Sequence, residues 1–215
     1  RWIVDPENAP VLDRRTFQEH NDEILNGHPE TGGTSGSTGM PVRFSQSPEW
    51  LRLARQDTAR FVALLGGPLP ALRIIYTDDK ELSPELLSVR TNVDKQIETI
   101  ARRHSEGDLQ AITTYPSNAA LLCERVLERA VDMSFIRRFG LYSEVIEPFH
   151  RRLVARAFPN ARVWTTYSSS EFGMIAAECP FEPGFHHIMA HRLGVEVLRD
   201  DDSPADDGER GRVVV

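Results

Sequence analysis

Short apolar segments alternate with amphipathic segments between residues 71 and 169, and this alternation restricts the fold more than any other feature of the chain. Three of the apolar segments have the composition of buried strands: 72–77, 109–115 and 161–167. Three segments carry apolar residues at helical spacing: 91–107, 119–131 and 144–158. We therefore predict an α/β fold with a largely parallel sheet and covering helices.

Turn and capping residues predict where the helices begin and end. Ser47 and Pro48 have the chemistry of an N-cap and a first helical residue, and the pair Gly66-Gly67 with Pro68 is expected to stop that helix. Gly107 is expected to close the helix over 91–107. The residues Pro116-Ser117-Asn118 are expected to form a turn between a strand and the next helix.

The last part of the chain has a different pattern. Short strands without helical periodicity are predicted in 186–193, 194–200 and 211–215. We therefore expect an α/β core over 1–175 and a small β-rich subdomain over 176–215. Arg1 does not resemble a natural start and the apolar run GRVVV ends without a polar tail, so we expect the chain to be cut from a longer protein or shortened internally.

The charge balance excludes several classes of partner. The chain has 25 basic and 32 acidic residues and a net charge of −7, with no basic stripe that could neutralise a phosphate backbone. No apolar run approaches the roughly 20 residues that cross a bilayer, and the N-terminus lacks a secretion signal. We predict a cytoplasmic protein with no nucleic-acid and no membrane partner. Cys123 and Cys179 lie far apart and are expected to be reduced.

The strongest chemical signal is the run TGGTSGSTG over 31–39, which is followed at once by MPVRF. Glycines let backbone N–H groups approach a polyanion, and interleaved Ser and Thr add hydroxyl donors, so this loop can wrap phosphate oxygens. It lacks the lysine of the common P-loop and the frame of a nucleophile elbow. The alternative interpretation is a disordered Gly/Ser loop.

A second signal is Tyr167-Ser168-Ser169-Ser170-Glu171, which comes just after a predicted strand. The carboxyl ends of parallel strands are where α/β sheets hold ligands. A hydroxyl beside a carboxylate suits phosphate and Mg²⁺, because magnesium often takes one carboxylate together with phosphate oxygens. The alternative interpretation is a helix cap with an acid three residues later.

Together the two motifs resemble those of the superfamily of acyl-CoA ligases, peptide-synthetase adenylation domains and luciferases, known as the adenylate-forming superfamily. Three further segments resemble its phenylacetate-CoA ligase branch and the CapK-like relatives: 114–124, 171–188 and 206–215. The resemblance covers most of the chain from Thr31 onward. It implies the core of the large N-terminal domain of an adenylate-forming enzyme, which uses ATP and Mg²⁺ to convert a carboxylic acid to its acyl-AMP.

The resemblance also implies residue roles. The loop residues would contact the β- and γ-phosphates of ATP: Thr34, Ser35, Gly36, Ser37, Thr38 and Gly39. Tyr167 would pack against adenine, Ser170 would contact the α-phosphate, and Glu171 would hold Mg²⁺. Thr38, Ser170 and Glu171 would take part in catalysis, in which orientation and charge neutralisation do the chemistry and no protein nucleophile is needed.

The acid site and the acceptor are implied less directly. Residues in relatives at the positions of Tyr115, Pro116, Ser117 and Gly140 line the acyl site, which points to an aryl or apolar carboxylic acid. The alternative is that these residues are ordinary turns and core. The branch implies coenzyme A as the acceptor. A homodimer is a candidate assembly.

The chain also departs from the family pattern. Relatives commonly carry lysine at the position of Met40, for which Arg43 is a candidate substitute. Their ribose-binding aspartate and their C-terminal lid domain with its lysine follow the position of Val215, so the lid domain is expected to be absent. The alternative function is therefore a truncated or degenerate non-catalytic nucleotide-binding module. A serine nucleophile at Ser35 or Ser37 with His28 as its base is disfavoured.

Two other clusters contain residue types that bind metals. Cys179, His186, His187 and His191 match no standard zinc spacing, so surface histidines are the favoured interpretation over a zinc site. The acidic run Asp200–Asp202 lacks the glycine and the final glutamate of a calcium loop. We predict a solvated turn there.

Overall fold

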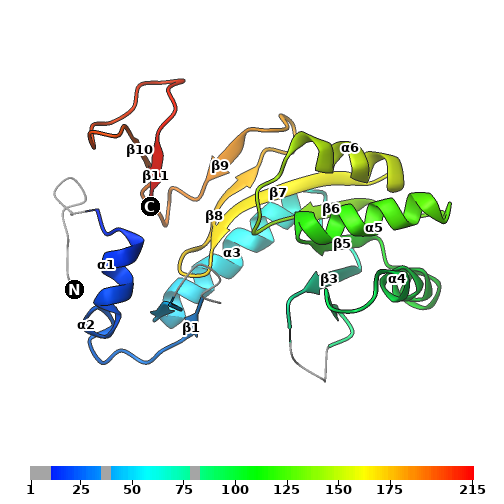
Figure 1. The fold of residues 1–215 in the computed structure, drawn as a ribbon, viewed down its shortest axis with the longest axis horizontal. Helices are drawn as coiled ribbons and strands as arrows, with labels where there is room; N and C mark the ends of the chain where they lie inside the picture. Colours follow the sequence, from blue (N-terminus) through cyan, green and yellow to red (C-terminus); the bar gives the residue numbers. More distant parts are fainter. Residues whose placement is uncertain (1–10, 35–39, 78–82) are drawn as a thin grey trace. The chain divides into compact units, whose positions relative to one another are not determined.

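The fold is that of a computed structural model, and the structure describes residues 11–34, 40–77 and 83–215 (Figure 1). The chain divides into two compact units. Unit 1 contains residues 1–60, 168–176 and 187–215, and unit 2 contains residues 61–167 and 177–186. The predicted division at residue 175 stays a prediction.

Unit 1 holds the N-terminal helices and two small hairpins. Its elements are α1 (Arg14–Glu19), α2 (Asn21–Leu25), β1 (Gly32–Gly33), β2 (Arg43–Phe44), most of α3 (Pro48–Leu64), β10 (Glu196–Leu198) and β11 (Arg212–Val214). The β1 strand pairs antiparallel with β2, and β10 pairs antiparallel with β11.

Unit 2 contains alternating strands and helices. Its elements are β3 (Ala71–Ile75), β4 (Leu86–Ser88), α4 (Val93–Gly107), β5 (Ala111–Thr114), α5 (Pro116–Glu128), β6 (Arg138–Leu141) and α6 (Pro148–Ala157). Three more strands contain residues of both units: β7 (Arg162–Ser169), β8 (Gly173–Glu178) and β9 (His186–Ile188).

The large sheet confirms the predicted fold class. Its seven strands follow the order β4-β3-β5-β6-β7-β8-β9. The pairs β3–β4, β3–β5, β5–β6 and β6–β7 are all parallel. Parallel neighbours need crossover connections, and α5 and α6 supply two of them. The sequence pattern of alternating strands and helices therefore gives a mostly parallel sheet with flanking helices.

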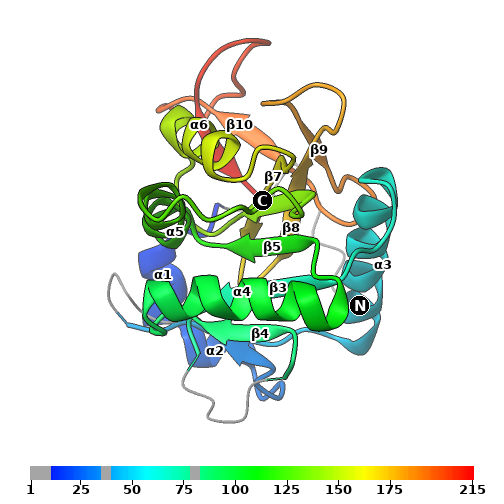
Figure 2. The same cartoon turned by 90° about the vertical axis from the view of Figure 1, so that its right-hand side faces the viewer.

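Helices α4, α5 and α6 lie next to one another along the strands (Figure 2). The apolar residues of β3, β5 and β6 that face these helices are fully buried, as Leu72, Ile112 and Phe139 show. They pack with Ile100 of α4 and Leu122 of α5, which are also fully buried. Each such side chain contributes about 1.5–3 kcal/mol by leaving water, so this layer carries the core of unit 2.

The opposite side of β6 is packed by an aromatic pair. Because side chains alternate along a strand, Gly140 points away from the face of its buried neighbours Phe139 and Leu141. A Cβ atom at Gly140 would lie 2.7 Å from Trp164 Cε2 and 3.0 Å from Thr113 Oγ1. The indole of Trp164 also meets the ring of Phe61 edge-on, with centroids 5.4 Å apart. Glycine is therefore required here for close packing.

The boundaries of α3 agree with the prediction. Ser47 Oγ accepts a hydrogen bond from the backbone N–H of Trp50 at 3.1 Å, and Pro48 is the first helical residue. Gly66 and Gly67 follow the helix with φ of +95° and +91°, which side-chain-bearing residues rarely adopt.

Of two other predicted boundaries, one is confirmed and one was wrong. The α4 helix ends at Gly107, as predicted, and the next residue, Asp108, adopts the left-handed conformation with φ of +55°. A short polar side chain tolerates this conformation, so aspartate takes the place that glycine usually has. Pro116, Ser117 and Asn118 form the first turn of α5 rather than a separate turn. Proline fits there because the first helical N–H has no partner inside the helix.

Within residues 11–34, 40–77 and 83–215, no helix combines the length and the apolar character needed to cross a membrane.

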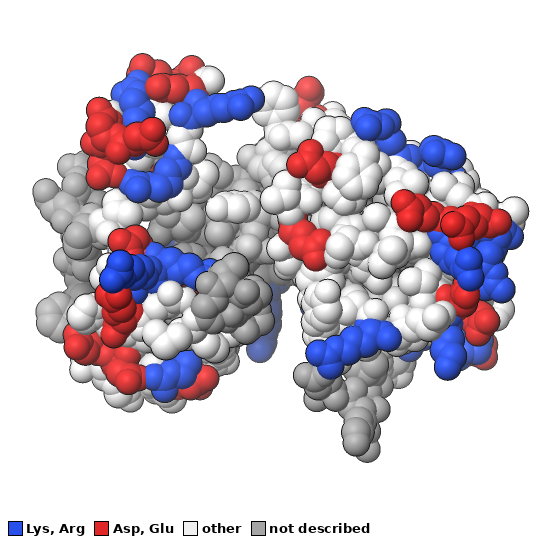
Figure 3. Space-filling view, viewed as in Figure 1, with Lys and Arg blue, Asp and Glu red and all other residues white. Residues whose placement is uncertain are grey.

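An ion-pair network joins α4 to α5. Asp94 Oδ1 and Oδ2 accept hydrogen bonds from Arg125 Nε at 2.6 Å and Nη2 at 2.9 Å, and Arg129 Nη1 adds a third at 3.0 Å. The Arg125 guanidinium holds the pKa of Asp94 below its ordinary value. Figure 3 shows acidic and basic side chains side by side where these helices lie.

We expect Gly140→Ala to destabilise the protein by about 1–3 kcal/mol, because the added methyl group overpacks the Trp164 contact. Gly107→Ala is the matched control, since a Cβ there meets open space in a helix and should stabilise by about 0.5–1 kcal/mol. Urea unfolding measures both free energies. Equal effects of the two substitutions would contradict the packing argument.

We expect Asp94→Asn to remove a pH-dependent part of the stability. The pKa of Asp94 is lowered in the folded state, so its contribution is present above the unfolded value of 3.8 and is lost as the pH falls through the folded value. The variant should be less stable than wild type at pH 7, and the difference should shrink below about pH 4. Asp207→Asn, in an exposed loop, should leave the pH profile unchanged. Urea unfolding between pH 7 and 3 measures these differences.

Candidate functional site

The predicted phosphate loop is the connection of a small hairpin in unit 1. Gly32 pairs with Phe44, and Gly33 pairs with Arg43. Beyond this pair, the Thr34 N–H donates to Val42 O at 2.9 Å, and Thr34 Oγ1 accepts from the Val42 N–H at 2.9 Å. Thr34 therefore closes the base of the loop with both its backbone and its hydroxyl. The predicted phosphate ligands over 35–39, Ser35, Gly36, Ser37, Thr38 and Gly39, lie outside the described residues.

Asn21 fixes the second strand of this hairpin. Its side-chain amide donates to Arg43 O at 2.8 Å and accepts from the Arg43 N–H at 2.9 Å, as a neighbouring strand would do. Arg43, the candidate substitute for a family lysine, directs its guanidinium at Asp22 in an ion pair, and at Glu30 at 4.0 Å. Met40 is exposed. The guanidinium of Arg43 is thus already partnered by carboxylates.

Ser170 and Glu171 lie in a turn between β7 and β8. The β7 strand runs to Ser169, two residues beyond the predicted end, and Tyr167 lies inside it with 48% exposure. Ser169 Oγ accepts from the Phe172 N–H at 3.1 Å and shapes a tight turn that leads straight into β8. The interpretation of this segment as a helix cap is therefore wrong.

Gln46 connects the loop hairpin to this turn, and sequence analysis missed it. Its side-chain Nε2 donates to Glu171 O at 2.7 Å and lies 3.4 Å from Ser170 O. Its backbone N–H donates to Thr31 Oγ1 at 2.7 Å, at the start of the hairpin. The two predicted motifs, which are over 120 residues apart in the chain, are thus brought together within one unit.

Three tyrosines form a row at one edge of the sheet in unit 2. Tyr76, Tyr115 and Tyr142 each follow directly the carboxyl end of a strand: β3, β5 and β6, which are neighbours. Ring centroids are 5.0 Å apart in both the Tyr76–Tyr115 and Tyr115–Tyr142 pairs. Burial raises the pKa of the Tyr142 phenol above its ordinary value, so it is protonated at neutral pH. Only Tyr115 was predicted; the position after a strand end was the signal for the other two.

The other predicted acid-site residues have structural partners. Ser117 donates its backbone N–H to Glu144 Oε2 and its hydroxyl to Glu144 Oε1, both at 2.8 Å. Pro116 is buried in the first turn of α5, and Gly140 lies against Trp164. Tyr115 and Ser117 thus lie together at the N-terminus of α5, whereas Gly140 allows Trp164 to pack closely against β6.

The candidate metal residues outside the two motifs have other neighbours. Among the described residues, no group of three or more His, Cys, Asp or Glu side chains is arranged to hold a metal ion. His186 Nε2 lies 3.1 Å from Thr165 Oγ1, and His191 Nε2 lies 2.8 Å from Asp57 Oδ1. Residues 200–202 form a turn between β10 and β11, as predicted, in which Asp201 Oδ1 accepts from the Ser203 N–H at 3.0 Å.

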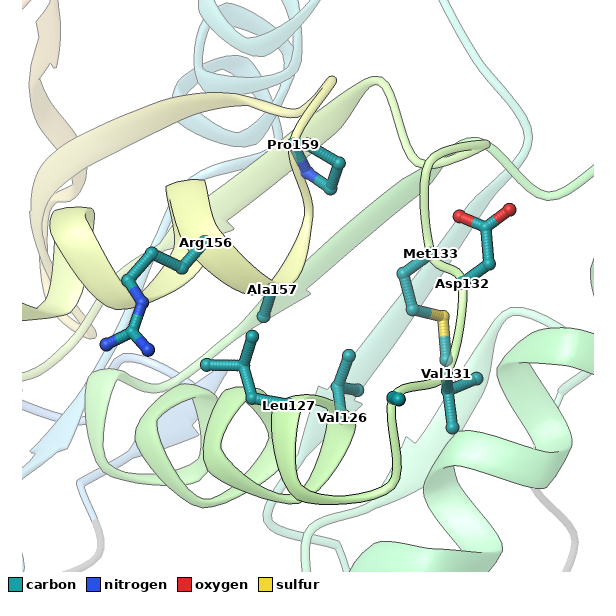
Figure 4. Close-up of a pocket in the computed structure, with 9 residues that line it drawn as sticks. Val126, Leu127, Val131, Asp132, Met133, Arg156, Ala157 and Pro159 are labelled. Atoms are coloured by element: carbon teal, nitrogen blue, oxygen red, sulfur yellow. The ribbon is translucent and has the colours of Figure 1, made fainter.

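One apolar pocket of unit 2 is not part of the candidate site. It has a volume of about 340 Å³ and lies where α5 and α6 end (Figure 4). Val126, Leu127, Met133 and Ala157 supply apolar lining. None of the predicted site residues that the structure describes lines it, and it lies at the end of α5 opposite to Tyr115 and Ser117.

No family model and no curated protein matches the chain. Solved structures of two CoA ligases and an amide bond synthetase do match. A 2-hydroxyisobutyryl-CoA ligase in complex with 2-HIB-AMP and CoA has a TM-score of 0.70 and 16% identity, over 95% of this chain and 49% of that one. The amide bond synthetase McbA from Marinactinospora thermotolerans has a TM-score of 0.60 and 20% identity, over 84% of this chain and 38% of that one.

The anthranilate CoA ligase AuaEII in complex with anthranoyl-AMP has a TM-score of 0.60 and 17% identity, over 83% of this chain and 37% of that one. The chain therefore shares its α/β fold with parts of these three structures. It spans less than half the length of each of these three structures.

We expect Asn21→Ala to lower the free energy of unfolding by about 1–3 kcal/mol, because it leaves the Arg43 N–H and C=O without partners in a part-buried position. Asn160→Ala is the matched control. Asn160 is exposed and donates one hydrogen bond, to Ser134 O, so its loss should cost less than about 1 kcal/mol. Urea unfolding of both variants tests whether Asn21 holds the loop hairpin.

Proposed function

We propose that this chain is the nucleotide-binding core of an enzyme that activates a carboxylic acid as its acyl-AMP, at the expense of ATP. The observation that carries the proposal is the Gln46 bridge, which joins the Gly/Ser/Thr loop hairpin to the Ser170–Glu171 turn. A phosphate-wrapping loop and an exposed hydroxyl beside a carboxylate are the parts that phosphate chemistry with Mg²⁺ requires. The shared fold with adenylate-forming enzymes supports the same conclusion.

The proposed role of each site residue follows from the chemistry of its side chain or backbone. The loop over 34–39 would supply N–H and hydroxyl donors to the β- and γ-phosphates, with Thr38 among them. Ser170 is exposed at the turn and would donate to the α-phosphate. Glu171, half-buried with its backbone held by Gln46, fits the single carboxylate that Mg²⁺ commonly takes beside phosphate oxygens. Bound Mg²⁺ would neutralise charge on the phosphates.

The reaction needs orientation more than covalent chemistry. A substrate carboxylate oxygen attacks the α-phosphorus, a new O–P bond forms, and the bond to the pyrophosphate oxygen breaks with its electron pair leaving on pyrophosphate. The protein contributes alignment and stabilisation of the developing charge. Tyr167, exposed on β7, is proposed to pack against adenine.

We further propose an aryl or apolar acid as the substrate and coenzyme A as the acceptor, as in the phenylacetate-CoA ligase branch. The tyrosine row supports this acid class, because aromatic rings offer an apolar face and edge contacts to another ring. Tyr76 is 62% exposed, so the row has surface left for a ligand.

Carboxylate-dependent ATP–pyrophosphate exchange with Mg²⁺ tests the proposal, across aryl, short-chain and amino acids. We expect exchange with aryl acids, and Glu171→Gln should reduce its rate by about 100-fold or more, because the metal loses its carboxylate ligand. Glu196→Gln on β10 is the matched control and should exchange at the wild-type rate.

Wild-type exchange in Glu171→Gln would remove Glu171 from the mechanism. ATP binding without exchange for any acid would favour a non-catalytic nucleotide-binding module.

A further inference from the structure

A buried arginine binds the backbone just after the Ser170–Glu171 turn. The side chain of Arg192 is 1% exposed. Its Nη1 donates to Phe172 O at 2.7 Å and its Nη2 donates to Met174 O at 2.5 Å. Phe172 is the residue after Glu171, and Met174 is the second residue of β8.

The charge of Arg192 is balanced in the interior of unit 1. Arg192 Nε donates to Asp57 Oδ2 of α3 at 2.9 Å, and the Asp57 side chain is fully buried. The guanidinium also stacks on the ring of Trp50, 4.4 Å from its centroid. A buried charge without such partners would be costly, so Asp57 and Trp50 hold the guanidinium in one orientation.

The turn is therefore held from two sides through its backbone. Gln46 donates to carbonyl groups of Ser170 and Glu171, and Arg192 donates to Phe172 O at the end of the turn and to Met174 O in β8. Glu171 is thus bound by Gln46 through its own carbonyl group and is followed directly by the first residue that Arg192 binds. A planar fork with several N–H groups in fixed geometry can bind two carbonyl groups at once, which a lysine ammonium on a flexible stem cannot reproduce.

We propose that Arg192, oriented by Asp57, is a positioning residue that holds the Ser170–Glu171 turn in one conformation and thereby sets the place of the Glu171 carboxylate. The role for magnesium in this inference rests on the proposed function. The hydrogen bonds between Arg192 and the turn do not depend on the proposed function, because they are present in the free chain.

Hydrogen exchange of the free chain tests directly whether Arg192 stabilises the backbone of the turn. In Arg192→Lys we expect the amides of the peptide over 168–176 to exchange about tenfold faster or more, because the local opening that exposes them becomes easier. Exchange over 111–126 in unit 2 should not change. Unchanged exchange over 168–176 would overturn the proposal.

Two further variants keep this test decisive. Asp57→Asn releases Arg192 without altering the turn itself, so it should raise exchange over 168–176 in the same way. Arg212→Lys is the matched control, because Arg212 pairs with Asp202 on the surface of the β10–β11 hairpin and should leave that exchange unchanged. If Arg192→Lys unfolds unit 1 as a whole, the exchange of Asp57→Asn over 168–176 decides whether Arg192 holds the turn.

The link to Glu171 is tested by ATP binding as a function of Mg²⁺ concentration. Arg192→Lys should raise the Mg²⁺ concentration at half-saturation by about tenfold, while in a Glu171→Gln background it should have no further effect, since interacting residues are non-additive. Additive effects would overturn a role through Glu171.

Wild-type chain that binds no ATP at any Mg²⁺ concentration would overturn the proposed function. In that case the hydrogen-exchange result would still decide whether Arg192 holds the turn.

Discussion

Parallel pairing of β3, β5, β6 and β7 is the constraint on which the arrangement of unit 2 depends. Parallel strands end at the same edge, so residues that are far apart in the chain meet wherever consecutive strands stop. Tyr76, Tyr115 and Tyr142 become neighbours for this reason alone. The same pairing requires crossovers, and α5 and α6 bury one face of the sheet while they provide them.

Unit 1 is organised differently, by side chains that bind backbone carbonyl groups. Asn21 completes the edge of β2, Gln46 binds the residues of the Ser170–Glu171 turn, and Arg192 binds the residues that follow it. Loops and turns cannot satisfy their own backbone groups as sheets do, so buried ones need such partners. These contacts fix the backbone of the Ser170–Glu171 turn.

The sequence predicted the α/β fold, because apolar periodicity reports directly on which residues face a core. It also predicted the limits of α3, where Ser47, Pro48 and the glycine pair are local signals. It also placed the end of α4 at Gly107, although the left-handed cap residue is the next one, Asp108. Local capping signals identify a helix end to within a residue or two, and tertiary packing decides which residue takes the left-handed conformation.

The same distinction explains which parts of the candidate site could be found from sequence. Ser170 and Glu171 stand in a recognisable motif, whereas Gln46 and Arg192 are single residues whose partners are backbone carbonyl groups far along the chain. A backbone carbonyl has no residue identity, so no pattern in the sequence marks the contact. At 16% identity to the 2-hydroxyisobutyryl-CoA ligase and 20% to the amide bond synthetase, the fold is shared while most side chains differ. Chemistry in such a fold depends on a few side chains and on the residues that hold their backbone, and the latter become visible only when the chain is folded.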